Sequence, residues 1–217
     1  MLLLIILSTF LLQQVSGQDF WMNECPSGFT EFTRSNWTNA QNYTRYVCLQ
    51  YFPITTTLNT DLICAKRYQG SMVAGIELDS ERTWLMAQAR ADFTARGISS
   101  GGVFVGAEQS PHCNHNCSYR SYFMWTDGFS LGNDQLVMDN WLPGNPDSQT
   151  NVIKSGEHCL EMLASTADSK RTDVHGRWND ISCTIKSSLS IFNNPLLPVN
   201  PWQPRGVLCG FRRHNLS

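Results

Sequence analysis

The sequence predicts one α+β domain, and three observations support this fold class. Two helix-like stretches come first, between residues 57 and 97, and short strand-like stretches follow them. A long segment rich in Gly, Asn, Asp, Ser and Pro then leads to a last strand-like stretch near the end of the chain. Eight cysteines are spread over the same length. Helices and strands grouped in this order indicate an α+β architecture.

The first helix is expected between Thr57 and Gly70, because Thr57 or Asn59 can cap its start and Gly commonly follows the last helical residue. Cys64 then lies on this helix and faces the core. A short strand is expected from Met72 to Ile76. Three apolar residues share one face of the predicted helix: Leu58, Leu62 and Ala65.

A second helix is expected to begin at Asp79 or Ser80 and to run through an Ala-rich stretch to a stop near Gly97. After it the character of the chain changes, and short apolar runs alternate with turn residues. These runs predict strands at three later positions: residues 103–105, 123–125 and 207–211.

A long loop is expected from Asp127 to Gly176, where the sequence shows little regular periodicity. A loop of that length inside a compact domain is either functional or disordered. Trp141 and Cys159 lie within it, and these residues favour an ordered loop. The sequence therefore predicts that this loop carries function.

The first residues predict an exported protein. Leu2 to Leu12 is almost wholly apolar, too short to span a bilayer, and lies where a signal peptide has its apolar region. Cleavage after the small residues Val15-Ser16-Gly17 gives a signal peptide of residues 1–17 and a mature domain of residues 18–217. No later apolar run predicts a membrane span. The net charge of −2 gives no reason to expect nucleic acid as a partner.

The cysteines predict a disulfide framework, because an even number in an exported protein is typical of one. Spacing alone does not choose the pairing. The stretch from His112 to Cys117 fits either a local disulfide or a compact zinc site with two thiolates and two imidazoles, and an oxidising compartment favours the disulfide. Three glycosylation sequons suit the same secretory route: Asn36, Asn42 and Asn215.

Four segments resemble one known family. They are Cys-Pro-Ser-Gly-Phe at residues 25–29, Trp-Thr-Asp-Gly at residues 125–128, Trp-Leu-Pro-Gly-Asn-Pro-Asp at residues 141–147 and Gly-Arg-Trp-Asn-Asp-Ile-Ser-Cys at residues 176–183. Together they resemble the C-type lectin family in its secreted, long, single-domain form. The last segment is the strongest match. The resemblance covers the chain from Cys25 to about Phe211.

The resemblance implies a C-type lectin-like fold, with two helices, small antiparallel sheets and a long disulfide-anchored loop region. It implies insertions near residues 30–45, 108–120 and 184–205. It also implies a disulfide pairing, in which the two cysteines left over by the family's framework bridge each other in a surface loop. The implied bridges are Cys25–Cys48, Cys64–Cys209, Cys159–Cys183 and Cys113–Cys117.

The resemblance further implies a calcium site that also binds the sugar. Calcium takes six to eight oxygen ligands, which mix carboxylates with amide carbonyls. In the family, the proline between the first two ligands is held in the cis form. The implied calcium ligands and carbohydrate-binding residues are the same five: Asn145, Asp147, Glu157, Asn179 and Asp180. Trp178, in the middle of the strongest match, is expected to be a core residue.

The expected function is that of a secreted, calcium-dependent lectin that binds carbohydrate on cells or glycoproteins. The amide of Asn145 in first place and the carboxylate of Asp147 in third place keep the order that the family uses for galactose-type sugars. The alternative is a calcium-independent lectin-like module that binds a protein or another non-sugar ligand. An enzyme is not expected, because the sequence holds no nucleophile motif and no HExxH-type metal site.

Overall fold

One mixed sheet organises the fold. Nine strands in the described part of the chain form it, and its main path follows the order β2-β3-β9-β5-β7-β8. The described helices include none that is long and apolar enough to cross a membrane. The computed structural model describes residues 20–38, 41–55, 60–110, 123–131, 140–147, 157–183 and 202–214.

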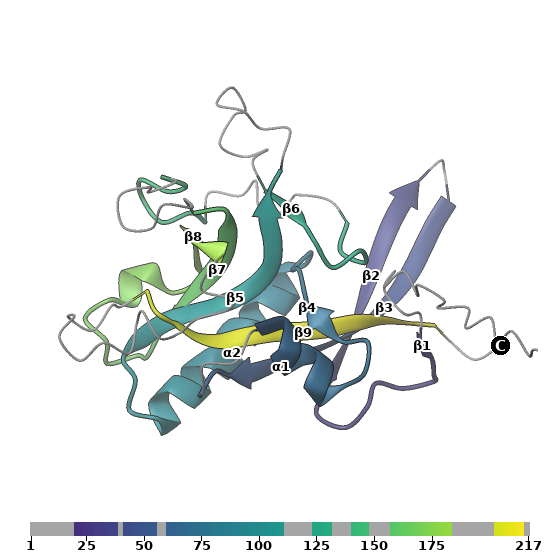
Figure 1. Cartoon of the computed structure of the whole chain (residues 1–217), viewed down its shortest axis with the longest axis horizontal. Coiled ribbons are helices and arrows are strands. Elements are labelled where there is room, and N and C mark those ends of the chain that lie inside the picture. Colours follow the sequence, from purple (N-terminus) through teal and green to yellow (C-terminus); the bar gives the residue numbers. More distant parts are fainter. Residues whose placement is uncertain are drawn as a thin grey trace, which may run out of the picture.

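Strand β9 (Pro204–His214) lies at the centre of the sheet (Figure 1). It pairs antiparallel with β3 (Gln41–Pro53) and parallel with β5 (Ser100–Gln109). Two short strands, β1 (Phe20–Trp21) and β4 (Met72–Val73), also pair with β9. The last strand of the chain therefore holds the N-terminal half of the sheet to the C-terminal half.

The other half of the sheet lies beyond β5. Strand β7 (Cys159–Ser165) pairs antiparallel with β5, and β8 (Arg177–Ile181) pairs antiparallel with β7. Strand β6 (Phe123–Trp125), which has the predicted bounds, pairs with the end of β5. A single turn of 3-10 helix, η2 (Thr172–Val174), lies between β7 and β8.

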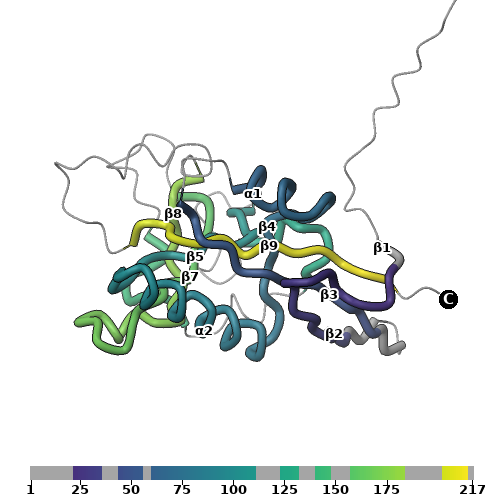
Figure 2. The backbone as a smooth tube through the Cα atoms, turned by 90° about the horizontal axis from the view of Figure 1, so that it is seen from below, coloured from purple at the N-terminus to yellow at the C-terminus, as the bar shows by residue number. Residues whose placement is uncertain are grey.

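The two helices, α1 (Thr60–Arg67) and α2 (Asp79–Ala95), lie on opposite sides of the central strands (Figure 2). Successive side chains of a strand point to opposite faces, and β5 follows this rule. Val105 packs in the larger core cluster with Leu85 of α2. Phe104 packs in the smaller cluster with the buried cysteine of α1. The central sheet is therefore apolar on both faces.

Helix α2 confirms the predicted second helix. Glu81 accepts hydrogen bonds from the backbone N–H groups of Glu77 (2.8 Å) and Leu78 (3.2 Å) just before the first turn. These contacts satisfy donors that the end of a helix leaves exposed. The helix stops before Gly97, which takes a φ of 65°, a left-handed conformation that glycine adopts without steric cost.

Three disulfides have the pairing that the resemblance implies. Cys64–Cys209 joins α1 to β9 across 145 residues of sequence. Closing a loop of that length stabilises the fold by about 4–5 kcal/mol in the chain-entropy model. The other two, Cys25–Cys48 and Cys159–Cys183, close shorter loops at the two ends of the sheet. The predicted Cys113–Cys117 bridge lies outside the described residues.

A buried ion cluster links the hairpin of β2 (Thr30–Thr38) and β3 to the start of α2. It consists of Arg34, Arg45, Glu77 and Glu81, and the side chains of Arg34 and Glu81 are fully buried. Arg34 donates to both carboxylate oxygens of Glu81 at 2.6 and 2.9 Å. Arg45 donates to both oxygens of Glu77 at 2.9 and 2.7 Å. Bidentate geometry of this kind makes the strongest protein ion pairs.

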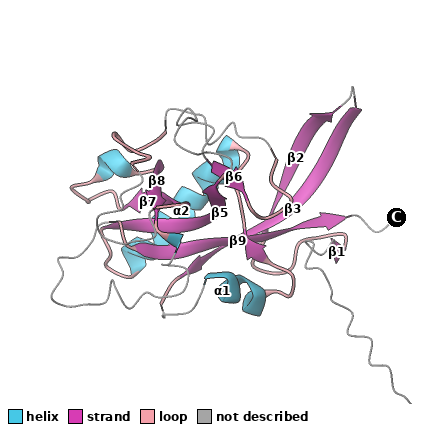
Figure 3. Ribbon diagram, turned by 45° about the horizontal axis from the view of Figure 1, so that its top comes forward, coloured by secondary structure: helices cyan, strands magenta, loops and turns pink. Residues whose placement is uncertain are grey.

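The insertion predicted near residues 30–45 is a long antiparallel hairpin. Strand β2 (Thr30–Thr38) pairs with β3 along its whole length. The pairing of β3 with β9 begins only at Tyr46, so the residues of β3 before it pair with β2 alone. Figure 3 shows this part of the hairpin extending beyond the rest of the sheet.

Two predictions about local structure are wrong. The loop predicted from Asp127 to Gly176 contains strand β7, all of whose residues are buried, so it shows none of the alternation that marks a half-exposed strand. The apolar face predicted for the first helix is also wrong. Leu62 is 49% exposed and Ala65 is exposed, because the disulfide of Cys64 holds a different side of α1 against the sheet.

Candidate functional site

Strand β8 positions the backbone of the candidate site. The backbone N–H of Trp178 donates to the carbonyl of Asn140 at 2.8 Å, and the N–H of Leu142 donates to the carbonyl of Trp178 at 2.9 Å. These bonds place residues 140–142 beside Trp178 of β8. The indole of Trp178 is fully buried, which confirms the prediction of a core residue. Its burial fixes the strand against the larger core cluster.

A tight turn follows in the same segment. The N–H of Asn145 donates to the carbonyl of Leu142 at 2.9 Å, and Gly144 has a φ of 93°. The Asn145–Pro146 peptide bond is cis, as the resemblance predicts. The turn brings Asn145 and Asp147 back onto the residues of β8.

Strand β7 and the Cys159–Cys183 disulfide also position residues of the site. In the β7–β8 register, Glu161 lies opposite Asn179 and Leu160 lies opposite Asp180. The Cys159–Cys183 bridge ties the start of β7 to the residues just beyond β8. Glu157 lies two residues before this bridge in the sequence, just before the start of β7.

Three carboxylates come together beside β7 and β8, and we name them the carboxylate cluster: Asp147, Glu157 and Asp180. One oxygen from each lies within 4.8 Å of the others. Asp147 is exposed, Glu157 is half-buried and Asp180 is buried. The backbone N–H of Asp147 also donates to Oδ1 of Asp180 at 3.2 Å. The cluster thus combines one fixed, buried carboxylate with two that solvent can reach.

The two predicted amide ligands lie beside the cluster. Nδ2 of Asn179 donates to Oε1 of Glu161 at 2.9 Å, and Oδ1 of the same amide accepts a hydrogen bond from Nδ2 of Asn145. Asn179 directly precedes Asp180 on β8. The structure therefore brings all five predicted residues together in one place.

Glu161 is a residue of the site that the sequence interpretation missed. It is fully buried, and its Oε2 has no hydrogen-bond partner in the described part of the chain. Burial raises the pKa of Glu161 well above its usual value; the Asn179 hydrogen bond opposes this rise, and the charges of Glu157 and Asp180 add to it. The signal was a lone acidic residue inside the apolar run Cys-Leu-Glu-Met-Leu-Ala at residues 159–164.

Strand β5 leaves room for this carboxyl group at Gly102. A Cβ atom on Gly102 would lie 1.7 Å from Oε2 of Glu161, closer than any real contact. Only glycine at this position allows Glu161 to reach the amide of Asn179. The orientation of Asn179 is therefore set by residues from three neighbouring strands, β5, β7 and β8.

The donor set fits calcium. Calcium binds oxygen ligands at 2.3–2.6 Å, so two ligands on opposite sides of one ion lie about 4.6–5.2 Å apart. The 4.8 Å limit on the separations within the carboxylate cluster is compatible with this span. An all-oxygen set with no imidazole or thiolate is typical of a hard cation. The residues that could hold the ion are the carboxylate cluster together with Asn145 and Asn179.

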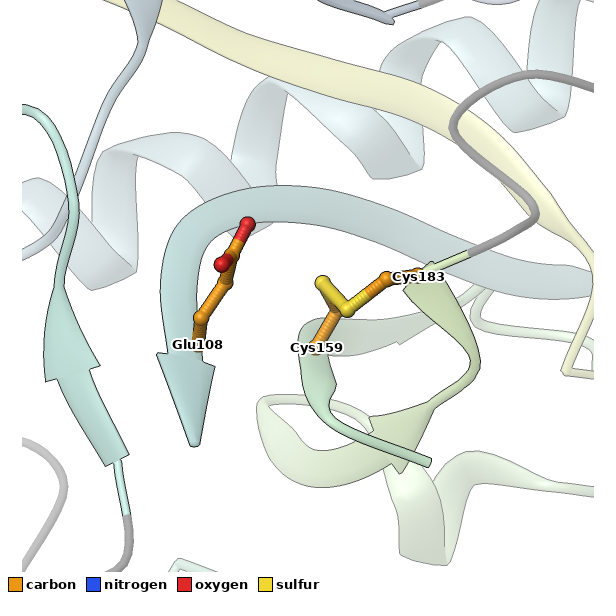
Figure 4. A group of neighbouring side chains, drawn as sticks. All are labelled: Glu108, Cys159 and Cys183. Atoms are coloured by element: carbon orange, nitrogen blue, oxygen red, sulfur yellow. A yellow bond between two sulfur atoms is a disulfide. The ribbon is translucent and has the colours of Figure 1, made fainter. Parts of the chain in front are cut away.

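A second group of potential metal ligands lies nearby but does not form a metal site. Glu108 lies opposite Cys159 in the β5–β7 register and beside Cys183 (Figure 4). The two sulfur atoms are bonded to each other, so neither is a thiolate that could bind a metal.

Several predicted features lie outside the described residues or depend on side chains that are not described. The signal peptide of residues 1–17 is outside, and so are residues 184–201 of the 184–205 insertion. The His112–Cys117 stretch with its zinc alternative is outside as well. Of the glycosylation sites, Asn215 is also outside. Asn36 and Asn42 lie on β2 and β3, where only the backbone is described.

Comparisons with known proteins match most of the chain. A family model described as C-type lectin domain-containing protein 141/158 matches residues 31–212. Among solved structures, the chain is similar to EMS16, an antagonist of the collagen receptor integrin α2β1, with 17% sequence identity and a TM-score of 0.37. That similarity covers 87% of this chain and 98% of EMS16. A search of curated proteins found no match. The family match includes all five predicted calcium ligands.

Proposed function

The chain belongs to the C-type lectin domain-containing protein 141/158 family, and we propose that it is a secreted, calcium-dependent lectin. The observation that carries the proposal is the convergence of the carboxylate cluster on one point beside two amides. Three carboxylates so close together repel one another, and a divalent cation between them turns that repulsion into attraction. The three described disulfides suit an exported protein.

The residues of the site each have a task in sugar binding. Calcium, when bound, supplies coordination positions for two adjacent sugar hydroxyls. The amides of Asn145 and Asn179 can donate hydrogen bonds to the same hydroxyls, and the carboxylates of Asp147 and Glu157 can accept hydrogen bonds from them. Glu161 holds the Asn179 amide with its oxygen towards Asn145, so it acts as a positioning residue.

We further propose a preference for galactose-type over mannose-type sugars. The cis turn presents an amide at Asn145 and a carboxylate at Asp147. Exchanging the two functional groups reverses which side of the site donates and which accepts hydrogen bonds. The double variant Asn145→Glu/Asp147→Asn makes this exchange while keeping the charge of the turn and the cis proline between them.

The test is retention of the secreted mature protein on dense galactose and mannose matrices, because multivalent display compensates for weak single sites. The proposal predicts calcium-dependent retention on galactose, release by EDTA, and stronger retention of the double variant on mannose. Retention that EDTA does not release would contradict the calcium mechanism. Retention of the wild type on mannose alone would contradict the sugar preference.

One contact favours a second candidate, a lectin-like module that binds a non-sugar ligand without calcium. The hydrogen bond from Asn145 already engages Oδ1 of Asn179, the oxygen that calcium would need. The Asn145→Ala variant separates the two candidates. If the Asn145 amide binds calcium, the variant should bind calcium more weakly. If the hydrogen bond is only structural, the variant should bind the non-sugar ligand as well as the wild type does.

A further inference from the structure

We propose that a cavity beside α2 binds the carboxylate or sulfate group of an acidic saccharide, at a site that needs neither calcium nor the carboxylate cluster. The cavity has a volume of about 310 Å³ and lies between one face of α2 and the turn that leads into β8. Its lining contains no acidic side chain. The lining residues are Arg82, Thr83, Met86, Ala87, Arg90, His175 and Gly176.

The position of the cavity separates it from the candidate calcium site. Arg82, Met86 and Arg90 are spaced by four residues, so they lie along one face of α2. Gly176 directly precedes β8, whereas Asn179 and Asp180 lie near the other end of that strand. At about 3.3 Å per residue, the separation of Gly176 from Asn179 along the strand is about 10 Å.

Arg90 supplies an oriented cationic group. Its Nε donates to the carbonyl oxygen of Ser165 at 3.0 Å, which fixes one edge of the guanidinium. Its two terminal nitrogens make no hydrogen bond or ion pair with any residue of the described ranges. A guanidinium fork of this kind binds carboxylate or sulfate oxygens in pairs.

Arg82 supplies a second cation with a donor left over. Its Nη2 pairs with Asp79, which is mostly exposed, at 3.0 Å. Its Nε is buried and has no hydrogen-bond partner in the described part of the chain. A buried donor without a partner is costly, and an anion held against this guanidinium would offset part of that cost.

His175 adds a neutral donor. Its Nδ1 accepts a hydrogen bond from the backbone N–H of Ser165 at 3.1 Å, so the neutral ring carries its proton on Nε2. Burial lowers the pKa of His175, and the positive charge of Arg90 lowers it further. The cavity therefore offers two guanidinium groups and one N–H donor.

The size and apolar part of the lining indicate what the anionic group is attached to. A volume of about 310 Å³ lies at the small end of ligand sites and far exceeds the volume of one sulfate or carboxylate group. Met86 is buried and Ala87 is exposed, and together they offer apolar surface beside the two arginines. A sugar ring has an apolar C–H face that fits this surface, and its acidic substituent fits the arginines.

The test uses three matched sugars: glucose, glucuronate and glucose 6-sulfate. Ligand-observed saturation-transfer NMR on the secreted mature protein, in excess EDTA, measures their affinities while the candidate calcium site is empty. We expect at least one acid to bind ten or more times more tightly than glucose. Binding of only one acid identifies carboxylate or sulfate as the group recognised. Equal binding of all three sugars, or binding of none, would overturn the proposal.

Variants locate the binding. Arg90→Gln should weaken binding of the acid at least fivefold, and Ala87→Glu should do the same while leaving both arginines in place. Lys66→Gln removes the same charge from an exposed position on α1 and should leave the affinity unchanged. An equal loss in the Lys66→Gln variant, or none in the other two, would overturn the proposal. Because EDTA is present throughout, failure here says nothing against the calcium-dependent lectin.

Discussion

The buried ion cluster and the carboxylate cluster both contain several acidic side chains. In the first, arginines pair with the acidic groups; in the second, the acidic groups lie close to one another. In the buried ion cluster, Glu81 is held by Arg34 and Glu77 is held by Arg45. Two cations and two anions balance one another inside the protein. In the carboxylate cluster, three groups of the same sign lie within 4.8 Å of one another at the edge of the sheet.

Because of this difference, we expect the buried ion cluster to stabilise the fold and the carboxylate cluster to respond to ions in the solvent. A fully paired buried cluster needs no ion from outside, so we expect its contribution to be the same with and without calcium. Converging carboxylates repel one another until a cation joins them. We therefore expect that changes in the buried ion cluster alter stability, and that changes in the carboxylate cluster alter the response to calcium.

The largest effect is expected for Arg34→Met. This change leaves the fully buried carboxylate of Glu81 without its bidentate partner, and breaking a buried pair in this way costs about 3–5 kcal/mol. Urea unfolding of the secreted protein measures the loss, which should be equal in calcium and in EDTA. The double variant Arg34→Met/Glu81→Leu should recover much of it. A loss below about 1 kcal/mol would mean that the pair is solvated after all.

The next effect is expected for Glu157→Gln, which removes one charge from the carboxylate cluster. At a calcium concentration of 100 times Kd, the wild type should gain about 2.7 kcal/mol of stability. For a domain of this size each kcal/mol raises Tm by about 2–4 °C. The variant should lose most of this calcium-dependent rise in Tm. The matched variant Glu24→Gln, at an exposed position far from this site in the sequence, should keep it.

A smaller change in calcium affinity is expected for Glu161→Met. This variant removes the acceptor that orients the Asn179 amide but no predicted ligand. Loss of such a supporting contact weakens metal binding by about 10–100-fold. A calcium titration followed by Tm measures the change. An unchanged affinity would show that Asn179 keeps its orientation without Glu161.

The smallest effect extends the comparison to the opposite end of β8, where His175 is a single titratable group. Its pKa in the folded protein is lowered from 6.5, so the unfolded chain binds its proton first as the pH falls. The stability that neutral His175 contributes is present above pH 6.5 and is lost as the pH falls through the folded pKa. The difference in unfolding free energy between wild type and His175→Gln should therefore decrease between pH 7.5 and pH 5.

The sequence predicts the elements whose ends carry local signals. Helix α2 begins beside Asp79 and stops before Gly97, and β6 is short and apolar between turn residues. It does not predict β7, because a strand buried on both faces lacks alternation. It also misses strand β2, because much of that hairpin pairs with its own partner strand beyond the rest of the sheet.

The candidate site shows the same limit. Its five predicted residues were found from short motifs that can be recognised in the sequence, and the structure brings these residues together. Glu161 was missed because its role depends on the register of β7 with β8 and on the space left by Gly102. The cavity was missed because its arginines and His175 lie far apart in the sequence and meet only through packing.

The most direct test of the central claim is a calorimetric calcium titration of the secreted mature protein. Wild type is compared with Asp180→Asn and with Asp173→Asn, a matched change at an exposed aspartate between β7 and β8. We expect one saturable site in the wild type, with Kd of the order of 0.1–1 mM, typical of extracellular calcium modules. We expect Asp180→Asn to abolish the site and Asp173→Asn to retain it. No binding at millimolar calcium, or equal binding by Asp180→Asn, would show that these residues do not form a calcium site.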